Sequence, residues 1–471
     1  MGLHVSVVVP VYNERFLVGE SIRRVLAVES PLIERLDVIV VDDGSTDGTR
    51  DVLRALAAAE PRIDYVEHDR NRGKGAAVRT GIARARGAVT LIHDADLEYD
   101  PRDIPSLVRP FLEAGADAAY GSRFLGGDYR RVLYFAHTLG NRLITFASNF
   151  FTNLNLTDVE TCYKAVRTRL LQSIPIRSND FRLEIELTFK LAKRGARIFE
   201  VPISYAGRTY EEGKKIGVRD GMLAFSAMLR WWVVDDIYDP DEYGSNILVA
   251  LSEVPRFNRW MADTVRPFVG QRVLEIGAGI GNLTRALIPR ERYTATDINP
   301  HYLDYLGNVA ESRPYLDVRH LDLADESEAL ALAGRYDTVV CLNVLEHVED
   351  EARGARNLFE VLEPGGRAIV LVPQGPSLYG TLDRVLGHRC RYTEASLRQA
   401  LATAGFEIER LFGFNRASRP GWWLNGKVLK RERFSRIQLK TLDWMIWLVR
   451  RVDRALPWGG LSLIAIARRP Q

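Results

Sequence analysis

The first half of the chain alternates short hydrophobic runs with amphipathic segments. Residues 5–9, 38–41 and 89–93 are rich in Val and Ile, as buried strands are, and residues 19–28 and 49–59 have apolar positions at helical spacing. Strands that alternate with helices in this way predict an α/β domain built on a buried, doubly wound parallel sheet.

The same alternation starts again near residue 272. Further strands are predicted at residues 293–296, 338–342, 367–372 and 462–467, so two sheets explain the chain better than one. Between the two halves, residues 235–245 are rich in Asp, Pro and Gly and have neither a helical nor a strand period. We therefore expect two α/β domains, at residues 1–234 and 250–471, joined by a linker at 235–249.

The composition is that of an ordinary globular protein, with 46% hydrophobic and 27% charged residues among 471. A formal net charge of +3 is too small to favour nucleic acid as a partner. The three cysteines are scattered, which predicts no disulfide framework, and we recognise neither a signal peptide nor an apolar run of roughly 18 residues. We expect a cytoplasmic protein, and peripheral association with the cytoplasmic face of a membrane stays open.

Polar loops follow three predicted strands of the first half, at residues 10–14, 42–47 and 94–98. Ligands of a doubly wound sheet bind beyond the carboxyl ends of its strands, where these loops would meet. An extended backbone would point Asp94, Asp96 and Glu98 to one side, and their oxygens suit Mg²⁺ or Mn²⁺. Such a cation would neutralise the charge on a departing nucleoside diphosphate. A solvated acidic turn is the alternative explanation of these carboxylates.

Further segments follow in the same order, at residues 71–75, 121–123, 158–165 and 200–205. With the loops, they resemble the family 2 glycosyltransferases of GT-A fold, and most closely the dolichol-phosphate mannosyltransferase or glucosyltransferase group, over residues 4–234. The resemblance implies transfer of a sugar from a UDP- or GDP-sugar to a polyprenyl phosphate or a glycan. It implies nucleotide-sugar contacts by Pro10, Tyr12, Glu14, Asp42, Asp94 and Arg123, metal ligation by Asp94, Asp96 and Glu98, and catalytic roles for Asp96, Arg208 and Lys214.

The acceptor decides which further groups the reaction needs. A hydroxyl acceptor requires a general base, for which Glu184 or Glu186 is the candidate. A polyprenyl phosphate is already anionic and requires cations such as Arg208 and Lys214 instead. Residues 131–151 mix large apolar side chains with basic ones, so this segment is either a helix at a membrane surface or a core helix.

A glycine-rich turn, Gly277-Ala278-Gly279-Ile280-Gly281, follows the first strand of the second half. Its glycines allow the backbone to approach a ligand, and Asp297 at the end of the next strand is suited to accept hydrogen bonds from two ribose hydroxyls. S-adenosylmethionine and a nicotinamide dinucleotide both satisfy these two features.

Glu275 and residues 320–323, 343–347 and 362–366 are further landmarks. Together with the turn, they resemble the class I S-adenosylmethionine-dependent methyltransferases, which have a Rossmann-like fold, over residues 250–471. The resemblance implies cofactor contacts by Glu275, Gly277, Gly279, Asp297, Asp322, Leu323 and Asn343. His347 is either the general base for an oxygen nucleophile or a residue that only shapes the pocket.

Residues 414–460 form a predicted helical insertion in which Trp occurs among Lys and Arg. This composition suits a membrane interface, a lid over a hydrophobic acceptor, or packing on the domain's own sheet. The whole chain is predicted to be a bifunctional transferase that transfers a sugar and methylates a related intermediate. Two alternatives stay open: one half is a non-catalytic binding module, or the second half is a nicotinamide-dependent oxidoreductase.

Overall fold

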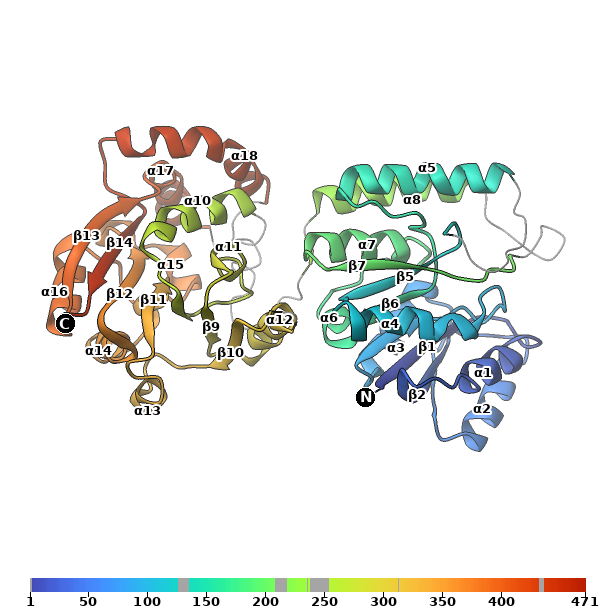
Figure 1. Ribbon diagram of the computed structural model, residues 1–471. Coiled ribbons are helices and arrows are strands. Elements are labelled where there is room, and N and C mark those ends of the chain that lie inside the picture. The colour runs from blue at the N-terminus through green and yellow to red at the C-terminus, as the bar shows by residue number, and fades with distance from the viewer. Residues whose placement is uncertain are drawn as a thin grey trace. The chain divides into compact units, whose positions relative to one another are not determined.

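The chain divides into two compact units, Met1–Asp239 and Pro240–Gln471 (Figure 1). The computed structural model describes residues 2–125, 135–207, 218–234, 236–237, 254–311, 313–431 and 436–471. The linker predicted at residues 235–249 lies outside the described residues except for Asp236 and Ile237, and Arg208 and Lys214 lie outside them entirely.

The N-terminal unit is built on a seven-stranded sheet in the order β3-β2-β1-β4-β6-β5-β7. Its strands are β1 (Leu3–Val11), β2 (Ile33–Asp42), β3 (Ile63–Glu67), β4 (Val89–Ile92), β5 (Ala118–Ser122), β6 (Lys164–Arg167) and β7 (Ile198–Pro202). Its helices are α1 (Val18–Leu26), α2 (Thr49–Ala59), α3 (Lys74–Arg84), α4 (Ile104–Glu113), α5 (Phe135–Thr152), α6 (Thr168–Gln172), α7 (Leu183–Lys193) and α8 (Val218–Val233).

One strand of this sheet departs from the predicted parallel arrangement. β6 runs antiparallel to both of its neighbours, β4 and β5. The strand has only four residues and begins with Lys164, so its sequence contains no apolar run by which it could be recognised. Mixed sheets of this kind are common in α/β domains, and the sheet remains buried.

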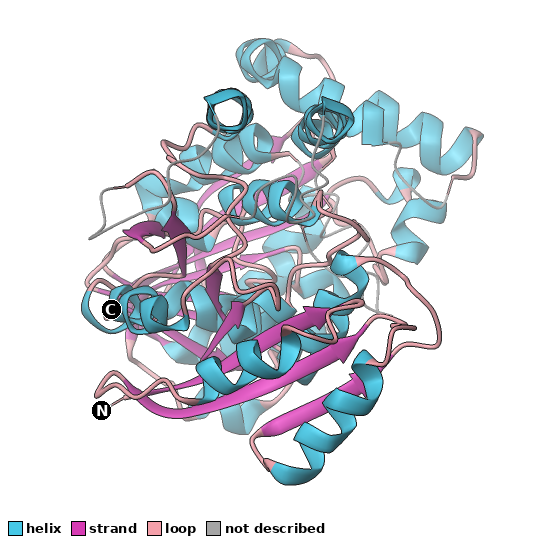
Figure 2. Ribbon diagram, turned by 90° about the vertical axis from the view of Figure 1, so that its right-hand side faces the viewer, coloured by secondary structure: helices cyan, strands magenta, loops and turns pink. Residues whose placement is uncertain are grey.

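Helices cover both faces of the N-terminal sheet, as Figure 2 shows. Successive residues of a strand point to opposite faces, so Val7 packs in the core that contains Ile22 of α1, while Val8 packs in the core that contains Ala77 of α3. Because both faces of the sheet are covered, its strands are continuous hydrophobic runs in the sequence.

The C-terminal unit has its own seven-stranded sheet, in the order β10-β9-β8-β11-β12-β14-β13. Its strands are β8 (Arg272–Ile276), β9 (Arg292–Asp297), β10 (Leu316–His320), β11 (Tyr336–Leu342), β12 (Leu362–Pro373), β13 (Glu407–Phe414) and β14 (Ser462–Arg468). β14 runs antiparallel to β12 and β13, and the other pairs are parallel. The order reverses direction between β8 and β11, which is where an α/β sheet of this type opens a ligand crevice.

The helices of the C-terminal unit also form two layers. They are α10 (Pro255–Val265), α11 (Thr284–Leu287), α12 (Pro300–Ala310), α13 (Glu326–Leu330), α14 (Glu351–Val361), α15 (Thr381–Val385), α16 (Glu394–Thr403), α17 (Arg419–Trp423) and α18 (Arg436–Val452). Leu358 of α14 and Leu397 of α16 pack in one core, while Leu306 of α12 and Ile446 of α18 pack in the other.

Two helices, α17 and α18, occupy the segment between β13 and β14 for which a helical insertion is predicted. One face of α18 packs on the unit through Ile446 and Val449, and Asp443 accepts hydrogen bonds from the backbone N–H groups of Arg256 and Phe257 at the start of α10. The other face exposes Trp444 and Trp447, so the helix both packs on its sheet and presents aromatic side chains to solvent.

No helix within the described ranges is long and apolar enough to cross a membrane.

Gly81 of α3 allows this helix to lie close to β1. A Cβ at Gly81 would lie 2.3 Å from Cγ1 of Val8, and Val cannot move its methyl groups freely because its side chain is stiff. We expect Gly81→Ala to lower the free energy of unfolding of this unit by about 1–3 kcal/mol through overpacking. Chemical denaturation of the full chain, followed by hydrogen exchange in β1, measures the change.

Gly140→Ala in α5 is the matched control, since no atom lies within 4 Å of the Cβ that it adds. This change is expected to leave stability unchanged or to raise it by up to about 1 kcal/mol. Equal effects of the two substitutions would contradict the packing argument.

Candidate active sites

The polar loops of the N-terminal unit meet at one edge of the sheet. β1 and β2 are in register to their ends, where Val11 pairs with Asp42, and the loops that follow are joined by hydrogen bonds. The backbone N–H of Asn13 donates to Oγ of Ser45 at 2.9 Å, and the N–H of Thr46 donates to Oδ1 of Asn13 at 2.9 Å. The first two predicted loops therefore form one surface beyond the strand ends.

Asp42 lies at the base of this surface and is fully buried. Its Oδ2 accepts hydrogen bonds from the N–H of Ser45 at 3.2 Å and from Nε of Arg50 at 2.8 Å. Its Oδ1 has no hydrogen-bond partner. A buried carboxylate oxygen without a partner is costly, so this atom is suited to accept a hydrogen bond from a ligand. Tyr12, in the first of these loops, has 47% of its surface exposed.

The acidic loop departs from the extended conformation that the sequence suggested. Leu97 has a φ of 62°, in the left-handed region, so the backbone turns between Asp96 and Glu98. Glu98 then accepts a hydrogen bond from the hydroxyl of Tyr205 at 2.6 Å, and Asp94 pairs with Lys74 at 2.9 Å. Among the described residues, Asp94, Asp96 and Glu98 do not form a group whose ligand atoms all lie within 4.8 Å of one another, and their ligation of a cation stays a prediction.

Lys74 is a site residue to which the sequence analysis assigned no role. Its Nζ lies 2.9 Å from Oδ1 of Asp94 and 2.9 Å from Oε1 of Glu184, and the side chain is almost buried. Burial lowers the pKa of Lys74, but the two carboxylates raise it by more. The pKa of Lys74 is therefore well above its ordinary value. The ammonium therefore stays charged in the site. Its place between two glycines at the start of a helix was the available sequence signal.

The glycines beside Lys74 bring α3 against the segment that leads into α7. A Cβ at Gly75 would lie 2.1 Å from the carbonyl oxygen of Ser178. This close approach places Lys74 within reach of Glu184, in the first turn of α7. Glycine at this position thus supports the ion-pair network.

The two candidate general bases have different environments. Glu186 is fully buried and accepts hydrogen bonds from the N–H groups of Arg177 and Ser178, and it pairs with Lys190 at 2.7 Å. These partners give Glu186 a structural role. Glu184 contacts Lys74 beside Asp94, so of the two glutamates it is Glu184 that borders the acidic loop.

Arg123, a predicted phosphate ligand, has a protein partner. Its Nε and Nη2 donate to the two oxygens of Asp158 at 2.6 and 2.7 Å, and its guanidinium lies over the ring of Tyr205. Tyr205 thus contacts Arg123 through its ring and Glu98 through its hydroxyl, which links these two residues. Its contact to a donor phosphate stays a prediction.

The glycine-rich turn of the C-terminal unit follows β8 directly. Gly277, Gly279 and Gly281 all have positive φ values, between 55° and 78°, which only glycine adopts without strain. The N–H of Gly279 donates to Oδ2 of Asp297 at 2.8 Å, and the N–H of Asn299 donates to its Oδ1 at 2.9 Å. The turn and the end of β9 are therefore held together, as a nucleoside site at this edge requires.

Glu275 lies beneath the turn and is 3% exposed. Its Oε2 accepts hydrogen bonds from the hydroxyls of Thr284 at 2.5 Å and Tyr293 at 2.9 Å. These contacts tie β8 to α11 and β9, so Glu275 positions the turn. Direct contact between Glu275 and the cofactor stays a prediction.

The remaining predicted cofactor residues lie beyond β10 and β11. The N–H of Asp322 donates to Glu328, and the carbonyl of the buried Leu323 accepts from the side chain of Asn357. Asn343 follows β11 with a φ of 55°, and its N–H donates to the carbonyl of Leu371 at 2.8 Å. Both loops are thus fixed at the same edge of the sheet as the turn.

His347 has a partner that the sequence did not reveal. Its ring lies 5.2 Å from the ring of His388, measured between centroids. Burial and the neighbouring His388 lower the pKa of His347. The adjacent Glu346 is buried, and burial raises the pKa of its carboxyl to about 8. His388 is therefore a functional candidate that only the fold brings together with the neighbouring Glu346 and His347.

Comparisons with known proteins agree with the division of the chain into two units. Residues 6–174 match the family model described as glycosyl transferase family 2, and residues 251–411 match one described as methyltransferase domain. The undecaprenyl-phosphate mannosyltransferase of Micrococcus luteus is 31% identical over 228 residues, which cover 46% of this chain and 88% of that protein. The polyprenol monophosphomannose synthase of Mycolicibacterium smegmatis is 30% identical over 225 residues, which cover 46% of this chain and 83% of that protein.

A solved structure of glucosyl-3-phosphoglycerate synthase from Mycobacterium tuberculosis, in complex with Mn²⁺, uridine diphosphate and glucosyl-3-phosphoglycerate, is 21% identical to this chain. The alignment has a TM-score of 0.38 and covers 51% of this chain and 82% of the synthase chain.

The chain belongs to the family 2 glycosyltransferases, and its second unit is a methyltransferase domain. It is a bifunctional transferase with two α/β units, of GT-A-like and methyltransferase-like fold. The match of residues 251–411 to a methyltransferase domain decides against the nicotinamide-dependent oxidoreductase.

Glu275 makes the stability of the C-terminal unit depend on pH. Burial raises its pKa from 4.5 to about 7, although the hydroxyls of Thr284 and Tyr293 lower it in part. The folded unit therefore binds this proton more tightly than the unfolded chain does. The resulting stabilisation is complete below pH 4.5 and is lost as the pH rises through about 7.

We expect Glu275→Gln, which cannot ionise, to remove this part of the pH dependence. Thermal unfolding of the full chain at about pH 5 and about pH 8 measures it. The midpoint of the wild type should fall relative to that of the variant at the higher pH. Glu291→Gln, at an exposed position, is the control and should follow the wild type. Parallel curves for wild type and Glu275→Gln would contradict the assignment.

Proposed function

We propose that the N-terminal unit transfers a sugar from a UDP- or GDP-sugar to a polyprenyl phosphate in a metal-dependent reaction, and that the C-terminal unit uses S-adenosylmethionine to methylate a related intermediate. The observation that carries the lipid acceptor is a continuous apolar surface on α5 and α8. The names of the two bacterial relatives, an undecaprenyl-phosphate mannosyltransferase and a polyprenol monophosphomannose synthase, support the same acceptor class.

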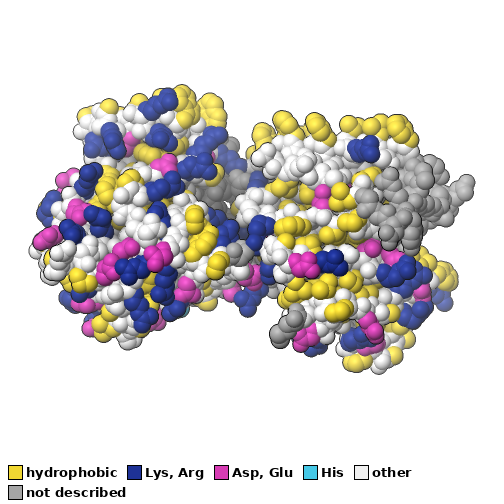
Figure 3. Space-filling view, viewed as in Figure 1, with side chains coloured by type: hydrophobic (Ala, Val, Ile, Leu, Met, Phe, Trp, Pro, Cys, Tyr) yellow, Lys and Arg dark blue, Asp and Glu magenta, His cyan; other side chains and the backbone are white. Residues whose placement is uncertain are grey.

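The apolar surface is formed by side chains at helical spacing on two packed helices. On α5, the exposed positions recur every three or four residues, as do those on α8. Figure 3 shows hydrophobic side chains along the edge of the unit where these helices lie. The exposed hydrophobic residues at this spacing are Phe135, Leu139, Leu143, Phe146 and Phe150 on α5, and Met222, Phe225, Leu229 and Trp232 on α8, where Leu223 and Val233 are also exposed.

The opposite face of α5 packs inward through Ile144, Ala147 and Phe151, so the helix is amphipathic. The core-helix interpretation of this segment explains only that inner face. Exposed aromatic and aliphatic side chains in such number are typical of a surface that contacts a partner or a membrane. Arg142 and Arg230, exposed on the same helices, suit the anionic head groups of a bilayer.

The apolar surface lies close to the site in the fold. Both α5 and α8 pack on α7, whose first turn contributes Glu184 to the network with Lys74 and Asp94. A lipid phosphate carried by a polyprenyl chain along α5 and α8 would therefore have a short path to the donor. Such an acceptor is anionic, so charged Lys74 and the predicted phosphate ligands Arg208 and Lys214 fit it better than a general base does.

Asp94 and Asp96 are the residues that would hold the metal. Mg²⁺ is commonly bound by one or two carboxylates together with substrate phosphates, so the site does not need three converging carboxylates. The cation would neutralise charge on the departing nucleoside diphosphate. In this proposal Glu98 is held by Tyr205 and supports the loop.

Substitution of each unit's central carboxylate should separate the two activities. We expect Asp96→Asn to abolish label transfer from a nucleotide-sugar to polyprenyl phosphate and to leave methyl transfer from labelled S-adenosylmethionine intact. Asp297→Asn should do the reverse, because it leaves one acceptor oxygen where Asp297 offers two to the ribose hydroxyls in the other unit. Counting organic-phase label and methyl label for both variants tests this expectation. If neither variant loses the activity of its own unit, the site assignments are overturned. If one unit is inactive in the wild type, the result favours the alternative that this unit is a non-catalytic binding module.

Replacement of the apolar side chains of α5 should release the protein from lipid. We expect Phe146→Glu with Phe150→Glu to weaken sedimentation with vesicles of anionic lipid, since each Phe removed from lipid costs about 1.5–3 kcal/mol. Leu112→Glu on α4, which is exposed but lies outside the surface, is the matched control. Equal vesicle binding by wild type, control and double variant would refute the membrane contact.

A further inference from the structure

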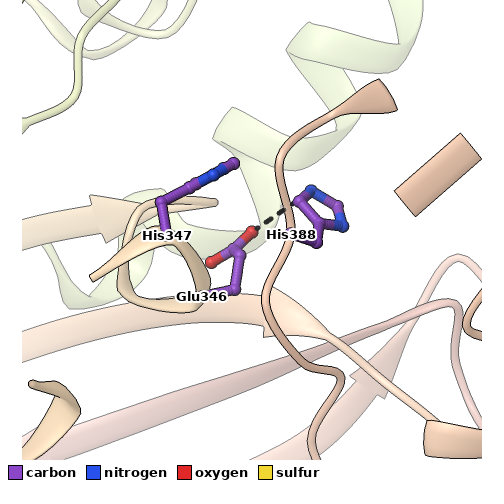
Figure 4. A group of neighbouring side chains, drawn as sticks. All are labelled: Glu346, His347 and His388. Carbon is purple, nitrogen blue, oxygen red and sulfur yellow. Dashed lines mark ion pairs between the residues drawn. The ribbon is translucent and has the colours of Figure 1, made fainter. Parts of the chain in front are cut away.

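Three potential metal ligands converge in the C-terminal unit. Glu346 and His347 lie in η3 (Leu345–His347), directly after β11, and His388 follows α15. One ligand atom from each residue lies within 4.8 Å of the other two. Figure 4 shows the Glu346 carboxylate between the two imidazole rings. Among the residues that the structure describes, no other group of His, Cys, Asp and Glu meets this condition.

Both histidines are oriented by a bond to Nδ1. Nδ1 of His347 lies 3.1 Å from the carbonyl oxygen of Gly387, which can only accept, so Nδ1 carries the proton. Nδ1 of His388 lies 3.0 Å from Oδ1 of Asp383 in the same way. Each ring therefore keeps the lone pair on Nε2, and this arrangement is how metal-binding histidines are usually held.

The partner of His388 is itself fixed. Asp383 is fully buried, and it accepts hydrogen bonds from Nε of Arg391 at 2.7 Å and from the N–H of Gly380 at 2.9 Å. In addition, the N–H of Arg389 donates to the carbonyl of Glu346 at 3.0 Å, which joins the two segments that carry the ligands. The three ligands are thus held in place before any ion binds.

The carboxylate of Glu346 lacks partners. The residue is 1% exposed, and neither of its side-chain oxygens has a hydrogen-bond partner. Nε2 of His388 approaches Oε1 only to 3.8 Å, which is too long for a hydrogen bond. Leaving buried carboxyl oxygens without a partner is costly, and a cation bound by Glu346 and the two Nε2 atoms would supply one.

We propose that Glu346, His347 and His388 bind one divalent first-row transition metal ion, with open positions for an oxygen of the methyl acceptor. Two imidazoles with one carboxylate are a ligand set typical of such ions when positions are left for substrate. The site borders the cofactor turn, because Val344, two residues before Glu346, packs against Gly277: a Cβ at Gly277 would lie 2.3 Å from Cγ2 of Val344.

The role of this ion rests on the proposed methyl transfer. A coordinated hydroxyl of the acceptor has a lowered pKa, so it releases its proton to solvent. Its oxygen then forms a bond to the methyl carbon as the bond from that carbon to the sulfonium sulfur breaks. The products are the methyl ether, S-adenosylhomocysteine and one proton. The ion would thereby take the place of a general base, which is one of the two roles that the sequence leaves open for His347.

Metal binding can be tested without a methyl acceptor. The full chain, without an affinity tag and with Asp96→Asn to remove the predicted metal site of the other unit, is stripped with a chelator and titrated with Co²⁺. We expect one ion per chain and a visible Co²⁺ absorption that reports imidazole ligands. His347→Ala should weaken binding by at least about tenfold, and because His347 is exposed the unit should still fold. Glu346→Gln should have the same effect.

Binding of S-adenosylhomocysteine, measured by calorimetry, confirms that each variant is folded. His320→Ala is the matched control, since His320 is an exposed histidine beside a carboxylate of the same unit, and its Co²⁺ binding should equal that of the parent. Asp383→Asn, which changes the partner of His388, should weaken binding by about 10–100-fold. No bound ion in the parent, or equal binding by parent, His347→Ala and Glu346→Gln, would overturn the site. Methyl transfer that persists after the ion is removed would retain the site and overturn its role.

Discussion

Burial of both faces of each sheet is the constraint on which the rest of this protein depends. Val7 and Val8 are neighbours in β1, yet they pack in different cores, with α1 on one face and α3 on the other. A strand buried on both faces carries few polar side chains. The chemistry is therefore displaced to the loops beyond the strand ends, and parallel strands deliver these loops to one edge.

Buried charges at these edges are held by partners from distant parts of the chain. Lys74 joins Asp94 and Glu184, and Asp383 joins His388 and Arg391. A buried ion that loses its partner is strongly destabilising, so these networks fix the geometry of each site. Buried carboxylate oxygens without a hydrogen-bond partner remain on Asp42, Glu184 and Glu346: Oδ1 of Asp42, Oε2 of Glu184 and both side-chain oxygens of Glu346. These oxygens are suited to contact a ligand.

Apolar helices give the transferase a second kind of surface. α5 and α8 expose a stripe of aromatic and aliphatic side chains in the N-terminal unit, and α18 exposes Trp444 and Trp447 in the C-terminal unit. Each of these helices also has a packed face, so exposure is confined to one side. Amphipathic helices with one exposed apolar face are typical of surfaces that contact a hydrophobic partner or a lipid surface.

The sequence by itself determined the two α/β units, the loops at their strand ends and the glycine-rich turn, because these depend on local hydrophobic period and on residues adjacent along the chain. It did not determine β6, which is too short to have a period, or the turn at Leu97 within the acidic loop. Only the tertiary structure decided that Lys74 meets Glu184 and that His388 meets Glu346 and His347. These residues are separated by 110 and about 40 positions, and contacts over such distances arise from packing, which no local pattern records.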